Sequence, residues 1–164
     1  MHKQNGFTVL ELVITMVMIG ILLAVGIVSY RSTLVASRDR ERVGDVETIA
    51  EYLEAIYPKE ILSGSTVIKK AGTYPATVVV NNAGYYTAAL EDLPRSAVLS
   101  PGSTTTSFIG ATVIIPTTSI SQYNYVPLQS SDTLCTSITQ ECRRFIIYYT
   151  KESGDTTTKG SVRR

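Results

Sequence analysis

The chain has 164 residues, of which 44% are hydrophobic and 18% are charged, and its formal net charge is +1. This length allows one domain together with an anchor, and so small a net charge gives no argument for a nucleic-acid partner. The only histidine is His2, and the sequence contains no phosphate-binding, nucleophile-elbow or Cys-x-x-Cys motif. If the first few residues are removed, His-based catalysis and His-ligated metals are excluded, and we expect no enzyme, no cofactor and no metal site.

An apolar run from Phe7 to Tyr30, FTVLELVITMVMIGILLAVGIVSY, follows a short polar leader, MHKQNG, at residues 1–6. The uncharged part, Leu12–Tyr30, would extend about 29 Å as a helix, which matches the hydrocarbon core of a bilayer. Glu11 is the only charged side chain in the run. Because a carboxylate near the centre of a membrane helix costs roughly 3 kcal/mol or more, Glu11 needs a partner. Residues 7–30 are thus predicted as a transmembrane helix.

Two simpler interpretations of this run remain open. A secretory signal peptide would have a shorter apolar core and a small-x-small cleavage site, for which only Leu23–Gly26 offers a weak candidate. A plain single-pass anchor explains the length of the run. It explains neither Glu11 nor the Gly6–Phe7 junction.

The segment Gly6-Phe7-Thr8-Val9-Leu10-Glu11-Leu12 resembles the processing site of type IV pilins and pseudopilins. In that family a prepilin peptidase cleaves after the glycine, and the new N-terminal residue is methylated. The resemblance implies that Gly6 ends the leader and that Phe7 becomes the methylated first residue. It also implies that Glu11 pairs with the amine of a neighbouring subunit during assembly, where carboxylate and ammonium would remove each other's burial penalty.

Residues 31–57 are predicted to continue the same helix, with a separate helix after a break near 29–37 as the alternative. Pro58 ends the pattern. Apolar residues recur at spacings of three and four and form an amphipathic stripe: Val43, Val46, Ile49, Ala50, Leu53, Ile56 and Tyr57.

Charges along this helix are sorted by sign. The basic residues come first, and the acidic ones follow: Arg31, Arg38, Arg40 and Arg42, then Asp45, Glu47, Glu51 and Glu54. One interpretation is a solvated face with local pairs such as Asp39–Arg42. The other is that the basic band of one subunit faces the acidic band of an axially shifted neighbour.

Residues 58–107 are predicted as a connecting αβ-loop, because glycine and proline interrupt them repeatedly. Short strands are expected at Thr66–Lys69 and Thr77–Val80. Between them, Gly72-Thr73-Tyr74-Pro75 resembles the G-x-Y-P element that follows the long helix in many pilins and pseudopilins. A turn closed by proline explains the same four residues equally well.

Residues 108–152 are predicted as an antiparallel sheet of three or four strands, drawn from Ile109–Ile115, Gln122–Val126 and Arg144–Thr150. Alternation places Tyr123 and Tyr125 together on one face, where a half-buried core role is expected. Residues 153–164 are predicted to be a polar, mobile tail.

Cys135 and Cys142 flank a short hydroxyl-rich segment near the last predicted strand. A disulfide is expected between them if the domain lies outside the cytoplasm, and two free thiols if it does not. Some pilins also carry a disulfide loop near the C-terminus.

Together these features predict an α+β, pilin-like fold in which a long N-terminal helix packs on a small antiparallel sheet. We interpret the chain as a structural subunit of a type IV pilus, which polymerises through this helix into an extracellular filament for adhesion, twitching motility or DNA uptake. The implied partners are copies of itself and other pilins, the prepilin peptidase, the assembly machinery and, before assembly, the cytoplasmic membrane. Direct binding of DNA has no support beyond the few basic residues of the tail.

Two alternatives to the pilus subunit are kept. The first is a pseudopilin of a type II secretion or competence system. Secretion pseudopilins often carry a calcium-binding acidic loop, for which Asp132, Glu152 and Asp155 are too scattered, and this favours the pilus. The second is a single-pass membrane-anchored domain that does not polymerise.

Overall fold

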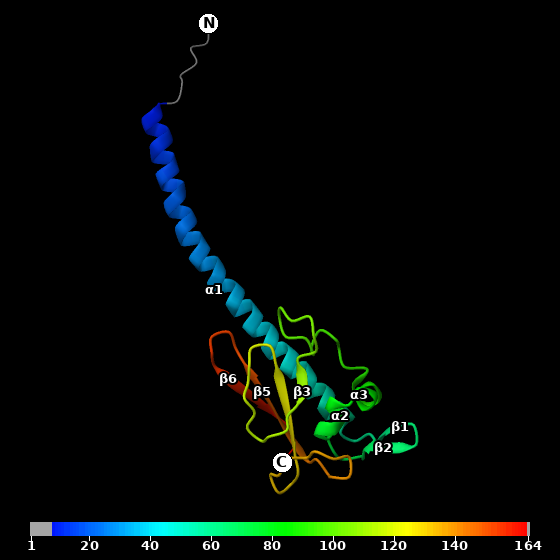
Figure 1. Cartoon of the computed structure of the whole chain (residues 1–164). Coiled ribbons are helices and arrows are strands. Elements are labelled where there is room, and N and C mark those ends of the chain that lie inside the picture. Colours follow the sequence, from blue (N-terminus) through cyan, green and yellow to red (C-terminus); the bar gives the residue numbers. More distant parts are fainter. Residues whose placement is uncertain (1–7, 164) are drawn as a thin grey trace. The chain divides into compact units, whose positions relative to one another are not determined.

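The structure is a computed structural model that describes residues 8–163, apart from the side chains of Val28 and Ser29. The chain divides into two compact units, residues 1–37 and residues 38–164. Helix α1 (Val9–Ile56) starts in the first unit and ends in the second without interruption (Figure 1). The predicted continuous helix is therefore confirmed, and the alternative break near 29–37 does not occur.

The second unit holds a four-stranded sheet in the order β3-β4-β5-β6 and a separate β1-β2 hairpin. Two short helices stand between the hairpin and the sheet in chain order. The strands and helices that follow α1 are β1 (Ile61–Ser63), β2 (Thr66–Lys69), α2 (Thr77–Asn81), α3 (Ala83–Leu90), β3 (Phe108–Gly110), β4 (Tyr123–Leu128), β5 (Arg144–Thr150) and β6 (Thr156–Gly160). This arrangement confirms the predicted α+β class and the predicted bounds of β2 and β5.

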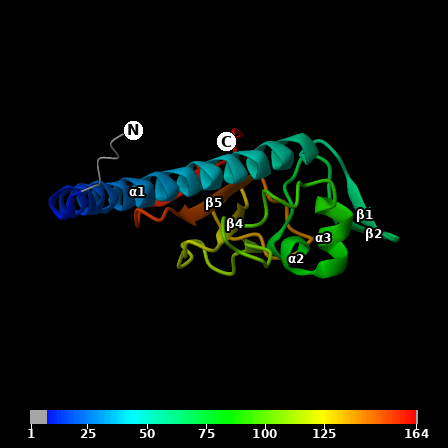
Figure 2. The same cartoon turned by 90° about the horizontal axis from the view of Figure 1, so that it is seen from above.

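The core of the second unit lies between the end of α1 and one face of the sheet (Figure 2). Helix α1 contributes the stripe that its spacing predicts, all of it buried: Val46, Ile49, Ala50, Leu53 and Ile56. From the sheet, alternation points Tyr123 and Tyr125 of β4 and Phe145 and Ile147 of β5 into the same core, and all four are 0% exposed. Val43 and Tyr57, at the margins of the predicted stripe, are only partly covered.

Residues 77–80 form part of helix α2, so the strand predicted there is wrong. Helical spacing places Thr77 and Asn81 on one side, where Asn81 binds the last residue of β3 and Thr77 binds the residue after it. The Thr77 hydroxyl donates to the Ala111 carbonyl at 3.0 Å, and the Asn81 amide exchanges two hydrogen bonds of 2.8 Å with the backbone of Gly110. These bonds satisfy the free edge of β3, and they override the strand propensity of the valines.

The strand predicted at 109–115 is also largely wrong, because β3 ends at Gly110. Strand β3 runs parallel to β4, so the sheet is mixed and not wholly antiparallel. Two parallel strands need a crossover connection of about a dozen residues. Residues 111–122 supply it and leave Val113, Ile114 and Ile115 exposed by 53%, 43% and 79%.

The predicted polar tail contains a further strand, so it does not lie outside the sheet. A turn from Lys151 to Asp155, with Gly154 at φ +94°, returns the chain along β5. Strand β6 then pairs antiparallel with β5, from Thr156 opposite Thr150 to Gly160 opposite Ile146. Three consecutive threonines suit this edge position, since β-branched side chains favour extended backbone without having to be apolar.

Candidate functional site

The start of α1 brings Thr8 and Glu11 together. The Glu11 backbone N–H donates to the Thr8 hydroxyl oxygen at 3.2 Å, and the Leu12 N–H donates to the Thr8 carbonyl at 3.2 Å. Thr8 thus caps the helix, and Glu11 occupies the third helical position, as in a Thr-x-x-Glu capping box. Sequence reasoning missed this role, although a Thr-x-x-Glu pattern before an apolar run is its usual signal. Gly6 and Phe7 lie outside the described residues, so cleavage and methylation there stay predictions.

From Leu12 to Ile27, α1 presents an apolar surface on every side. The large hydrophobic side chains between Val9 and Ile27 are all exposed by 49% or more. The hydroxyl of Thr15 donates to the Leu12 carbonyl within the same helix at 2.9 Å. Among the described residues, α1 is the helix that is long and apolar enough to cross a membrane. Such a surface needs lipid or other apolar helices around it.

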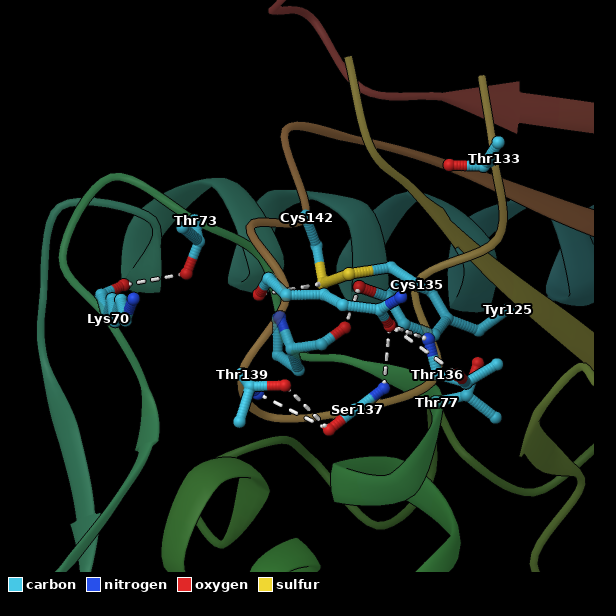
Figure 3. Close-up of a disulfide and its surroundings, with 12 residues drawn as sticks. Lys70, Thr73, Thr77, Tyr125, Thr133, Cys135, Thr136, Ser137, Thr139 and Cys142 are labelled. Atoms are coloured by element: carbon cyan, nitrogen blue, oxygen red, sulfur yellow. Dashed lines mark hydrogen bonds between the residues drawn. A yellow bond between two sulfur atoms is a disulfide. The ribbon is translucent and has the colours of Figure 1, made fainter. Parts of the chain in front are cut away.

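Cys135 and Cys142 form the predicted disulfide, with their Cα atoms 5.7 Å apart (Figure 3). The carbonyl of Cys135 accepts the Thr77 N–H at 2.9 Å, and the carbonyl of Cys142 accepts the Tyr74 N–H at 2.8 Å. Inside the loop, the Gln140 side chain accepts the N–H groups of residues 136 and 137 at 2.7 and 2.9 Å. The disulfide therefore closes a small ordered loop and ties it to α2 and to the segment before α2.

The Gly72–Pro75 segment joins that loop to the core. Gly72 has φ +73°, a conformation that favours glycine, and forms a turn with Ala71, whereas Tyr74 forms an antiparallel β-bridge with Cys142. Tyr74 is 1% exposed and its hydroxyl donates to a Glu54 carboxylate oxygen at 2.7 Å, while its ring meets Phe145 edge-on at 4.8 Å. Burial, together with the bond to Glu54, raises the pKa of Tyr74 well above its usual value. The element thus begins in a turn at Gly72, and its tyrosine enters the core.

Comparison with known families matches the Prokaryotic N-terminal methylation motif to residues 1–27. This chain carries the methylation motif of type IV pilins and pseudopilins. The motif implies processing by a prepilin peptidase and assembly into pilin filaments, and with the apolar helix it indicates anchoring in a membrane before assembly. It also points to a structural subunit. No curated protein and no solved structure matches the chain in two further comparisons.

Part of the basic band on α1 points into the second unit. The Arg42 side chain is 2% exposed, and its guanidinium donates at 3.1 Å each to Asp39, to Glu152 and to the carbonyl of Ile120. Arg38 also binds Glu152, with both carboxylate oxygens at 3.2 Å. Burial raises the pKa of Glu152, but the bonds from Arg42 and Arg38 outweigh this effect and hold the pKa below its usual value. The predicted local pair Asp39–Arg42 is confirmed, and Arg42 is not free to face another subunit.

The acidic band on α1 is also largely bound within the chain. Glu47 binds Lys159 of β6 at 2.6 Å, and Glu54 binds Arg163 at 3.2 Å. Asp45 accepts the Tyr123 hydroxyl at 2.7 Å, and burial raises its pKa to about 6 despite that bond. The two basic tail residues that are described, Lys159 and Arg163, are thus neutralised by α1.

Lys69 binds backbone carbonyls next to the C-terminal end of α1, a role that sequence reasoning missed. It is 2% exposed, and its amine donates to the carbonyls of Tyr57, Lys59 and Lys70 at 3.1, 2.6 and 3.2 Å. Burial lowers the pKa of Lys69 to about 8. The ammonium thus joins Tyr57 and Lys59, which lie just after α1, to Lys70, which directly follows β2.

Proposed function

We propose that this chain is a structural subunit of a type IV pilus, which polymerises through α1 into an extracellular filament. The observation that carries the proposal is a single carboxylate, Glu11, in the first part of α1, residues 9–27, which carries no other charge and is exposed on every side. The matched motif over residues 1–27 supports cleavage after Gly6 and methylation of Phe7. Adhesion, twitching motility and DNA uptake are the activities that such a filament would serve.

The acidic residues of the second unit favour a pilus over a calcium-binding secretion pseudopilin. Asp132 pairs with Arg144, and Glu152 is held by two arginines. Carboxylates engaged by arginines are poorly placed to serve as calcium ligands. A pseudopilin of a competence system stays the alternative that the described residues fit equally well.

The first test is the mature N-terminus. Mass spectrometry of the chain from cells that contain a prepilin peptidase should find it starting at Phe7 and carrying one N-methyl group. Electron microscopy of sheared cell-surface material should then show filaments that contain this chain. An N-terminus left intact at Met1 in such cells would contradict the proposal.

The second test separates the two roles available to Glu11. Glu11→Gln keeps a capping-box side chain and removes the charge, whereas Glu11→Ala removes both. If Glu11 pairs with a neighbour's amine, both variants should insert in the membrane and both should lose filaments. Normal filaments from Glu11→Gln would show that Glu11 serves only as a cap.

A further inference from the structure

The outer face of α1 in the second unit carries charges that the chain itself leaves unpaired. Most charged side chains between residues 38 and 54 bind a partner within the chain. Within the described part of the chain, three are exposed and make no hydrogen bond or ion pair: Arg40, Glu41 and Glu51. Charges of both signs thus remain on one helix for a partner outside the subunit.

Arg40 borders a small recess beside α1. The recess has a volume of about 210 Å³ and is lined by Asp39, Arg40, Val43 and Lys151. The Asp39 carboxylate is already taken, because its Oδ1 accepts from Arg42 at 3.1 Å and from the Glu152 N–H at 2.7 Å. The recess therefore offers two cations around the partly exposed Val43, a setting that suits a carboxylate.

Glu51 lies on the same side of α1 as Arg40. Eleven residues are close to three full turns, so the two side chains share a face about 16 Å apart along the axis. That distance is too long for an ion pair within one chain. Close to Glu51, Glu47 binds Lys159, and the two carboxylates, Glu47 first, raise the pKa of this lysine. The ammonium is bound by Glu47 and acts on Glu51 only as a nearby charge, which leaves an excess of negative charge at Glu51.

The helix surface between these two groups is open at Gly44. Gly44 lies on the same face, and an added Cβ there would meet nothing within 4 Å. A second helix can therefore approach this stretch closely.

We propose that the Arg40–Lys151 recess of one subunit receives Glu51 of a second copy, displaced along α1 by about three turns. The contact joins two different surfaces of the same chain, so each copy offers both halves. Heterologous contacts of this kind generate open helical filaments when they do not close into a ring. The inference rests on the proposed function and specifies which surfaces of the second unit meet in the filament.

Charge reversal with rescue tests this pairing. Arg40→Glu and Glu51→Arg should each lower the yield of sheared filaments by roughly fivefold or more, because each turns an attraction into a repulsion at every repeat. The double variant Arg40→Glu/Glu51→Arg should restore the yield by exchanging the partners. The matched controls Arg95→Glu and Glu60→Arg reverse exposed charges elsewhere and should leave the yield unchanged.

The outcomes separate this inference from the proposed function. Correct cleavage at Phe7 in every variant, checked by mass spectrometry, shows that processing is intact. Normal yields from both single variants, or a double variant no better than the singles, would overturn the pairing. Controls that fall as far as the single variants would overturn it as well. A cleaved wild-type chain that makes no filaments would instead refute the proposed function.

Discussion

Replacing Arg42 by alanine should destabilise the second unit far more than replacing Arg40, two residues away. Arg42 is buried and joins α1 to the crossover connection through Ile120 and to the β5–β6 turn through Glu152. Its removal would leave two carboxylates and a carbonyl short of a donor. Arg40, by contrast, is exposed and makes no hydrogen bond or ion pair among the described residues.

The expected cost of Arg42→Ala follows from these contacts. Breaking a buried ion pair by removing one partner costs 3–5 kcal/mol as a rule. The lower end applies here, because the side chain of Glu152 is 15% exposed and keeps Arg38, and the side chain of Asp39 is 16% exposed. We therefore expect a loss of about 3 kcal/mol in the free energy of unfolding. Arg42→Lys keeps the positive charge but not the planar guanidinium, so its loss in the free energy of unfolding should be about half that of Arg42→Ala.

Urea unfolding of the full chain in detergent measures this effect. The chain has ten tyrosines, of which nine lie in the second unit, and no tryptophan, so tyrosine signals mainly report the packing of the second unit. A loss of about 3 kcal/mol lowers the urea midpoint by roughly 1–3 M, whereas Arg40→Ala should stay within about 0.5 kcal/mol of wild type. Amide exchange around Ile120 should also accelerate in Arg42→Ala. An Arg42→Ala variant as stable as Arg40→Ala would refute the assignment of Arg42 as an internal strut.

Three further predictions concern the second unit. Gly110→Ala should lower the free energy of unfolding by about 1–3 kcal/mol, since the added Cβ would lie 2.8 Å from the Thr77 carbonyl oxygen. Gly44→Ala, where the added Cβ meets nothing within 4 Å, should raise it by about 0.5–1 kcal/mol, and thermal unfolding of both variants checks this. Replacing both Cys135 and Cys142 by alanine should cost about 2.5 kcal/mol in denaturant unfolding, and a chain as stable as wild type would contradict a bridge present in the cell. Because the folded pKa of Asp45 is raised to about 6, its carboxylate binds a proton more readily in the folded state, so its contribution to stability falls as pH rises from 4 to 7. The free energy of unfolding of Asp45→Asn and of wild type should be measured at pH 4 and at pH 7. The variant should be more stable relative to wild type at pH 7 than at pH 4, and a difference that stays constant would rule this out.

Local periodicity predicted the elements whose sequence and environment agree. The stripe on α1 repeats at three and four residues and stops before Pro58, and the alternation in Arg144–Thr150 has period two. Strand β6 was not predicted, because its polar threonines show no alternation of apolar and polar residues. The parallel pairing of β3 with β4 was not predicted, because it depends on the connection between the two strands and no local sequence pattern determines which strands become neighbours.

At the candidate site, the sequence predicted the helices and strands better than it predicted the partners that buried charged side chains bind. Arg42 stands four residues before Val46, so it extends the buried stripe towards the N-terminus. That spacing was an available signal for an inward arginine. Lys69 had no comparable signal, because two of its three carbonyl acceptors, Tyr57 and Lys59, lie ten or more residues before it in the chain.

The charges of α1 thus separate into an inward and an outward set. Arg42, Asp45 and Glu54 hold the second unit together, which leaves few groups to recognise a neighbour. An exposed ion pair contributes only about 0.2–1 kcal/mol, so Arg40 and Glu51 cannot drive polymerisation on their own. The apolar surface of residues 9–27 can supply the association energy, but it looks much the same at every turn and specifies no axial position. Charged contacts contribute more to the register between two partners than to their affinity. Glu11 in the apolar half of α1 and the Arg40–Glu51 pair in the polar half would therefore each fix the axial position of one subunit against the next.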